Sequence, residues 1–193
     1  MKLYYKVKNI ILNTFLEKKQ ALIIFSKFIA IILIIDLIQI IAKEIISGFT
    51  DYLFLYNPLL NGFIHSGFNH FFDNVILIFL LLLPKINYEL GIKGIVYFTV
   101  IISIISFPFV LTGISDPIRG SSGLYFLLLT RYLISRKKYK IIYICILLLF
   151  VYREIINLGN QDNISHFIHI IGVLVGLLSM KFNILSLPKD CRR

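Results

Sequence analysis

Two adjacent serines lie between two glycines in the segment 120–123, GSSG, just before an apolar run. A serine hydroxyl becomes a useful nucleophile only when a base lies within about 3 Å of it, and histidine is the most common base. Each glycine inside a helix is about 0.5–1 kcal/mol less favourable than alanine. Two glycines at a helix entrance therefore indicate that another backbone approaches this segment closely. The segment is suited to acyl-transfer chemistry if that neighbour carries a histidine.

The four histidines of the chain lie near the starts of two other apolar segments. His65 and His70 lie at the start of one of them, and Asn74 follows His70 by one helical turn on the same face. His166 and His169 begin the other. Polar groups inside membrane spans are rare and are functional candidates by default.

A stripe of small residues connects the second histidine pair to the serines. Gly172 and Gly176 follow His169 at i+3 and i+7, so all three lie on one helical face. Glycines on such a face let a neighbouring backbone come very close. Gly120 and Gly123 offer the matching small surface, and we expect the two segments to touch there.

The segments that carry these residues are long and apolar. Hydrophobic residues make up 58% of the chain, a fraction typical of integral membrane proteins. Six apolar segments are predicted to be transmembrane helices, and several approach the ~20 residues that a span requires. They are 21–43, 66–84, 93–112, 120–135, 139–157 and 165–182. The sequence therefore predicts an all-α membrane protein with six transmembrane helices.

The net charge of +10 is unevenly distributed along the chain. Lys and Arg gather in the N-terminal region, in the connections after the second and fourth spans, and in the C-terminal tail. Only Lys43, Arg119 and Arg153 fall elsewhere. Cytoplasmic segments collect Lys and Arg, so both termini are predicted to be cytoplasmic, with a lipid bilayer and not nucleic acid as the partner of the chain. The even-numbered spans then run inward, and the serines and histidines all lie near the outer face.

The fourth span is short, at ~16 residues or about 24 Å, against a hydrocarbon layer of about 30 Å. If the basic run from Arg131 to Lys138 fixes its inner end at the cytoplasmic surface, Ser122 lies below the outer surface yet within reach of water. The Ser122 N–H, in the first turn, has no intrahelical acceptor and stands at the positive end of the helix dipole. Such a group stabilises an oxyanion, and the side chains of His70 and Asn74 add further donors.

Of the two serines, Ser122 is the predicted nucleophile. It lies beside Gly123 and shares a helix face with Phe126 at i+4, which is the face that meets the sixth span. Neighbouring residues on a helix point about 100° apart, so Ser121 shares its face with Tyr125 and points away from that contact.

Three motifs in this order resemble the signatures of rhomboid intramembrane serine proteases. They are HSGFNHFFDN (65–74), GSSG (120–123) and HIIGVLVG (169–176), and the likeness covers the second to sixth spans. The resemblance implies a six-helix bundle of rhomboid type in which Ser122 is the nucleophile and His169 its general base. It also implies that His70 and Asn74 bind the oxyanion together with the Ser122 amide. His65 would lie close by in the substrate cavity.

The resemblance further implies a Ser–His dyad that acts, without metal or cofactor, on a transmembrane helix of a single-pass membrane protein. We find no carboxylate in the sequence that is placed to orient His169. Phe126 matches the aromatic position that packs beside the histidine. One departure is the loop between the first two spans, which carries a Trp-Arg pair in many members. This chain has no tryptophan, and the loop reads FTDYLFLYNPLL.

The predicted organisation has three parts. Residues 1–20 form an amphipathic cytoplasmic arm, residues 21–182 form the rhomboid-like membrane domain, and residues 183–193 form a basic cytoplasmic tail. The expected location is the plasma membrane of a prokaryote.

Two alternatives remain open. Four histidines near the outer face also fit a histidine-ligated metal or haem protein, although no carboxylate or thiolate obviously joins them in the sequence. The second alternative is a catalytically inactive rhomboid-like protein that binds transmembrane helices, against which the intact Ser122 and His169 argue. His166 is expected to be an entrance or water-facing histidine rather than a second base.

Overall fold

The structure is a computed structural model of the 193-residue chain. It describes the backbone of residues 2–45, 57–64, 68–112, 120–136, 140–159 and 166–181, and the side chains of these residues except 2–15, 43–45, 68–70 and 159. Every regular element in these residues is a helix. The elements are α1 (Lys2–Ile45), η1 (Asn61–Phe63), α3 (Phe68–Leu82), α4 (Lys85–Tyr88), α5 (Gly91–Leu111), α6 (Ser122–Ser135), α7 (Lys140–Ile156), η2 (Asn157–Gly159) and α8 (His166–Lys181). The predicted all-α class is confirmed for the described residues.

The last five predicted segments each coincide with one helix, to within about two residues at each end. The first is part of a longer element, because α1 continues without a break from Lys2 to Ile45 and includes most of the predicted arm. By length and composition, two described stretches are able to cross a bilayer, Leu16–Ala42 in α1 and Gly91–Leu111 in α5. Shorter apolar stretches lie in α3 and α8. The number of spans and the positions of the termini stay predictions.

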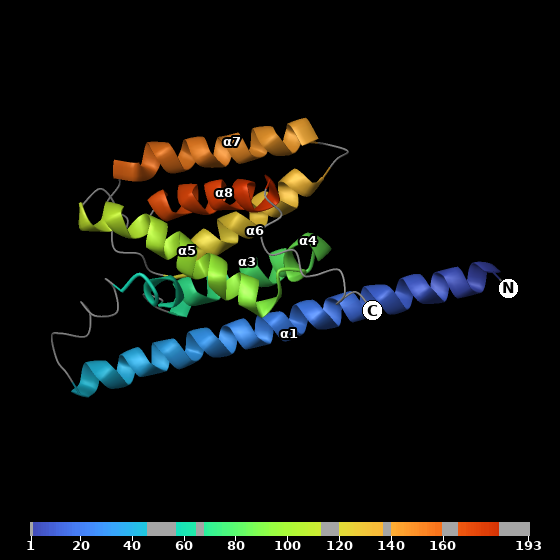
Figure 1. Ribbon diagram of the computed structural model, residues 1–193, viewed down its shortest axis with the longest axis horizontal. Helices are drawn as coiled ribbons and strands as arrows, with labels where there is room; N and C mark the ends of the chain where they lie inside the picture. The colour runs from blue at the N-terminus through green and yellow to red at the C-terminus, as the bar shows by residue number, and fades with distance from the viewer. Residues whose placement is uncertain are drawn as a thin grey trace.

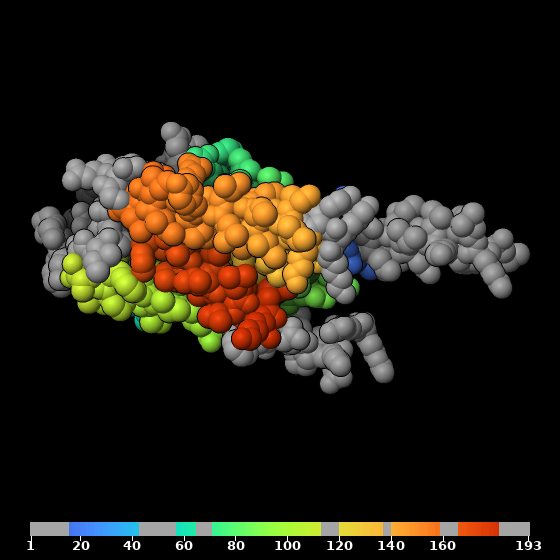
Figure 2. Space-filling view, turned by 90° about the horizontal axis from the view of Figure 1, so that it is seen from above, coloured from blue at the N-terminus to red at the C-terminus, as the bar shows by residue number. Residues whose placement is uncertain are grey.

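Helix α6 lies at the centre of the bundle. It contacts α3, α4, α5, α7 and α8, and its most extensive contact is with α8 (Figure 1). Helix α7 lies along one edge and borders α8 on the face shown in Figure 2. Helix α1 lies at the opposite edge, against α3 and α5 (Figure 1). Buried apolar side chains from α1, α3, α5, α6 and α8 fill the core, among them Phe28, Ile78, Phe98, Leu127 and Val175.

The loop between α1 and α3 is held at its described end by a buried turn. All three residues of η1 are buried. The Phe63 ring packs against Phe28 of α1, with 6.1 Å between ring centroids. A side chain at Gly62 would meet Thr99 and Ser103 of α5, so the backbone lies directly against that helix. An aromatic contact and a close backbone approach therefore hold this part of a loop that has no tryptophan. Residues 49–56 lie outside the described part.

Two buried polar side chains fix the end of α6 that lies away from the serines. The Asn87 amide of α4 donates a 2.9 Å hydrogen bond to the carbonyl of Leu128 in α6. The Arg131 guanidinium of α6 donates to Ser179 Oγ in α8 and to the Ile86 carbonyl, both at 2.8 Å. Leaving such buried groups unpaired costs about 1–3 kcal/mol each. This pair, here called the Asn87–Arg131 anchor, therefore sets the position of α6 along its axis relative to α4 and α8.

Candidate active site

Helices α6 and α8 are in backbone contact, and glycines permit that contact. A Cβ atom at Gly172 would overlap the Gly123 carbonyl oxygen. A Cβ atom at Gly123 would lie 2.9 Å from Ile168 Cγ1, and one at Gly176 would lie 3.0 Å from the Leu127 carbonyl oxygen. Real Cβ atoms essentially never approach a neighbour more closely than 3.0 Å. The structure thus brings the GSSG segment against the glycine stripe of α8.

The chain enters α6 through a backbone conformation that favours glycine. Gly120 has a φ of 86°, in the left-handed region where a Cβ atom would be strained. Ser121 is the N-cap residue, and its side chain makes no capping hydrogen bond. Ser121 is buried, and its hydroxyl has no hydrogen-bond partner among the described residues, whereas Ser122, the first residue of the helix, is partly exposed. Of the two hydroxyl-bearing residues, Ser122 is therefore the one that solvent can reach.

The His169 ring is held by an aromatic side chain of α6. The Phe126 ring stacks on it, with 4.4 Å between ring centroids and an interplanar angle of 20°. Phe150 of α7 meets Phe126 edge-on, with 6.3 Å between centroids. Ser122 precedes Phe126 by one turn and shares its face, so it lies on the side of α6 that meets α8. Among the hydrogen bonds of the described residues, none joins Ser122 to His169. Catalytic hydrogen bonds often tighten only when substrate is bound.

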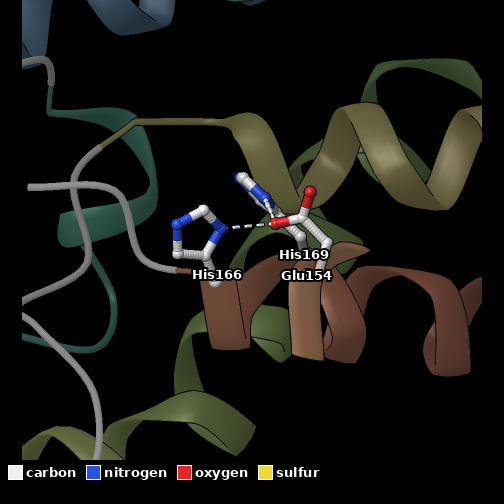
Figure 3. A group of neighbouring side chains, drawn as sticks. All are labelled: Glu154, His166 and His169. Carbon is white, nitrogen blue, oxygen red and sulfur yellow. Dashed lines mark hydrogen bonds and ion pairs between the residues drawn. The ribbon is translucent and has the colours of Figure 1, made fainter. Parts of the chain in front are cut away.

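A carboxylate lies beside His169. Glu154 Oε2, near the end of α7, is 2.7 Å from His169 Nδ1 and 2.7 Å from His166 Nδ1. Figure 3 shows the carboxylate with both rings directed at this oxygen. All three side chains are buried. An ionised carboxylate only accepts hydrogen bonds, so with Glu154 ionised the donor in both bonds is an Nδ1–H. Nε2 is then the basic nitrogen of His169.

Two expectations from the sequence are wrong at this point. A carboxylate is placed to orient His169, and His166 does not face water, because it is only 7% exposed and contacts Glu154. One signal was available, since Glu154 is the sole acidic residue in the apolar segment 139–157. Acidic residues in such segments are rare and functional by default.

The residues expected to bind an oxyanion are described only in part. Asn74 is buried in α3, and its Nδ2 has no hydrogen-bond partner within the described residues. An unpaired buried donor is unfavourable by about 1–3 kcal/mol, and an anionic ligand would satisfy it. The backbone of His70 belongs to the first turn of α3, and its side chain lies outside the described ones. His65 also lies outside the described residues.

Glu154, His166 and His169 also form a group with possible metal ligands. Each offers one ligand atom, and these atoms lie within 4.8 Å of one another. Ligand atoms around a tetrahedral zinc ion lie about 3.3 Å apart, and each Nδ1 would have to lose its proton to bind the metal. The two observed N···O distances of 2.7 Å are those of charge-assisted hydrogen bonds. The observed geometry therefore fits hydrogen bonding better than metal binding.

Comparison with known protein families identifies a family for this chain. The family model of the rhomboid domain matches residues 54–184, a region that contains α3 to α8 and every residue of the site described above. No curated protein and no solved structure matches the chain. Because the match covers well over half of the sequence, the chain belongs to the rhomboid family.

Proposed function

We propose that the protein is a serine endopeptidase that cleaves transmembrane segments of single-pass membrane proteins near the outer face of the membrane. Members of the rhomboid family are in general intramembrane serine proteases, and this member is an integral membrane protein with apolar helices. The observation that carries the proposal is the stack of Phe126 on His169. Ser122 shares the helix face of Phe126, which favours a serine and a histidine that act together.

The reaction requires a nucleophile, a base and oxyanion donors. Ser122 Oγ attacks the carbonyl carbon of the scissile peptide bond, and its proton passes to His169 Nε2. The oxygen that becomes negatively charged accepts hydrogen bonds from the Ser122 N–H and from Asn74 and His70. When the C–N bond breaks, His169 returns the proton to the leaving amine. Water then attacks the acyl ester in the same way, releasing the carboxylic acid and restoring the Ser122 hydroxyl.

The direct test uses the purified protein in proteoliposomes with a panel of single-pass membrane substrates. We expect cleavage near the outer ends of some of these spans, located by mass spectrometry of the products, and covalent labelling of Ser122 by a serine-directed phosphonate. A folded wild type that cleaves no panel member and takes up no phosphonate would support the inactive, helix-binding alternative instead.

Asn74→Ala is expected to lower the turnover number about 10²–10³-fold, because one donor to the oxyanion is lost. Its Nδ2 has no partner in the described residues, so the fold should be retained. The measurement is kcat for a panel substrate, with thermal stability as a check on folding. Asp73→Ala, at the exposed neighbouring position, is the control. Unchanged turnover in Asn74→Ala would remove this residue from the site.

We also infer a six-span topology with both termini cytoplasmic, with residues 1–20 as an arm and 183–193 as a tail, in the plasma membrane of a prokaryote. The distribution of Lys and Arg supports this arrangement. In a variant without the native cysteines, Asn57→Cys is expected to react with a membrane-impermeant maleimide added to intact cells, and Lys137→Cys is not. Labelling at position 137 in sealed right-side-out vesicles would contradict the topology.

A metal-binding function is the second candidate, favoured by the group of Glu154, His166 and His169. Metal analysis of the purified protein distinguishes the metal-binding function from the protease function. The protease proposal predicts full activity in EDTA and no stoichiometric metal. One zinc ion per chain, with activity lost in EDTA and restored by zinc, would favour the metal site.

A further inference from the structure

Glu154 is a carboxylate buried in an apolar helix, and the hydrogen bonds that the structure gives it are to histidines. It is 5% exposed, and its Oε2 accepts from Nδ1 of both His166 and His169. Removing an ionised carboxylate from water is unfavourable by several kcal/mol, and such groups persist when they are paired and hydrogen-bonded. Two imidazole N–H donors meet that requirement. The two histidines therefore compensate for the burial of Glu154, and one of them is the proposed general base.

The same hydrogen bond restrains His169 in a way that its aromatic contact does not. Phe126 lies against the face of the His169 ring and limits its tilt. Glu154 binds the edge of the ring at Nδ1, which fixes its rotation within its own plane and determines which nitrogen carries the proton. Phe126 of α6 and Glu154 of α7 thus restrain both the tilt of the His169 ring and its rotation within its own plane. Nε2 is left as the basic atom.

We propose that Glu154 positions His169 as the general base, so that the site operates as a Ser–His–Glu triad rather than as a Ser–His dyad. The proposal rests on the proposed function, because it requires that His169 accepts the proton of Ser122. Glu154 holds the tautomer with the proton on Nδ1 and stabilises the imidazolium that forms when Nε2 takes the proton. It acts through His169 and is a positioning residue.

His166 supplies a matched comparison for this role. It lies one turn before His169 on α8 and donates to the same oxygen, and the two rings meet edge-on with 6.1 Å between centroids. Removing His166 takes away one donor to Glu154 but leaves the bond between Glu154 and His169. If Glu154 serves only the stability of the fold, loss of its bond to His166 and loss of its bond to His169 should have similar effects on activity. If Glu154 positions the base, only loss of the bond to His169 should lower activity strongly.

The experiment compares wild type with Glu154→Gln, Glu154→Asp and His166→Gln. Glu154→Gln is expected to lower kcat about 10²–10⁴-fold while KM changes less than about twofold. The rate of inactivation by a small phosphonate should fall by the same factor, because this reagent reacts with Ser122 without a transmembrane substrate. Glu154→Asp keeps the carboxylate and should restore part of the rate. His166→Gln should lower kcat less than about tenfold.

Three results would contradict the positioning role of Glu154. Glu154→Gln with kcat within about threefold of wild type, or with a raised KM and unchanged kcat, would overturn the positioning role. So would equal losses in Glu154→Gln and His166→Gln. If the glutamine variant does not fold, Glu154→Asp decides: a rate no lower than wild type, despite the shortened side chain, would overturn the proposal.

A spectroscopic readout separates this inference from the proposed function. Nitrogen NMR of histidine-labelled wild type should show His169 as the tautomer with the proton on Nδ1, and Glu154→Gln should lose that preference. A wild-type His169 protonated on Nε2 would overturn the inference, whatever the activity. A wild type with the expected tautomer that neither cleaves substrate nor reacts with phosphonate would overturn the proposed function while leaving the hydrogen bond established.

Discussion

Ser122→Ala is expected to abolish both cleavage of membrane substrates and labelling by a phosphonate. Removing the nucleophile of a serine protease lowers kcat about 10⁶-fold, which is below detection in a proteoliposome assay. His169→Ala should have the same effect, because without a base the hydroxyl of Ser122 is not activated. The measurements are product formation by gel or mass spectrometry and covalent modification of the intact protein.

Ser121→Ala is the matched control for this prediction. Its hydroxyl is buried and has no hydrogen-bond partner in the described residues, so the substitution removes no bond, and we expect substantial activity to remain. The opposite pattern, with Ser121 essential and Ser122 dispensable, would show that the start of α6 is rotated relative to the assignment made above.

Gly172→Ala is expected to have the largest effect on stability. The new Cβ atom would overlap the Gly123 carbonyl oxygen and would lie 3.1 Å from Phe126 Cβ. Overpacking typically costs about 1–3 kcal/mol, and backbone on both sides leaves little room to relax. We expect a loss of about 3 kcal/mol in the free energy of unfolding, with loss of cleavage because α8 and His169 move away from α6.

Denaturant titration and the cleavage assay test this prediction together. Leu174→Ala is the control, since this side chain is on the same helix and 49% exposed, and it should change stability by less than about 1 kcal/mol. Gly176→Ala should be intermediate, because its closest neighbour would be Thr130 Cβ at 2.8 Å rather than a carbonyl oxygen in overlap. Normal stability and activity in Gly172→Ala would contradict the described contact between the helices.

The helices and their closest contact follow from local properties of the sequence. Apolar length predicts where helices form, and glycines at spacings of three and four residues mark the face on which a neighbour packs. Gly123, Gly172 and Gly176 therefore carried enough information for us to expect that α6 meets α8. The resemblance to the rhomboid family, and not the glycine pattern, led us to expect Phe126 beside His169, where the structure has it.

The pairing of Glu154 with His166 and His169, and the Asn87–Arg131 anchor, required the three-dimensional structure. Helix α7 is apolar over nearly its whole circumference, so its sequence does not show which side faces α8. The acceptors of Asn87 and Arg131 include main-chain carbonyls 41 and 45 residues away. Every residue offers such a carbonyl, so no pattern marks the particular one that is used. Polar contacts of this kind depend on helix rotation and axial position, which only packing determines.

The Asn87–Arg131 anchor has a consequence for bilayers of different thickness. Ser122 and Arg131 belong to one helix, along whose axis they are about 13.5 Å apart. With the topology proposed above, Arg131 lies on the cytoplasmic side of Ser122, and the anchor fixes the height of Ser122 relative to α4 and α8. Lipids with longer acyl chains thicken the bilayer around the whole bundle, while the anchor holds α6 in place against α4 and α8. If the protein cleaves as proposed, the depth of Ser122 in a thicker bilayer is set by how the whole bundle sits in the bilayer and not by a movement of α6 alone.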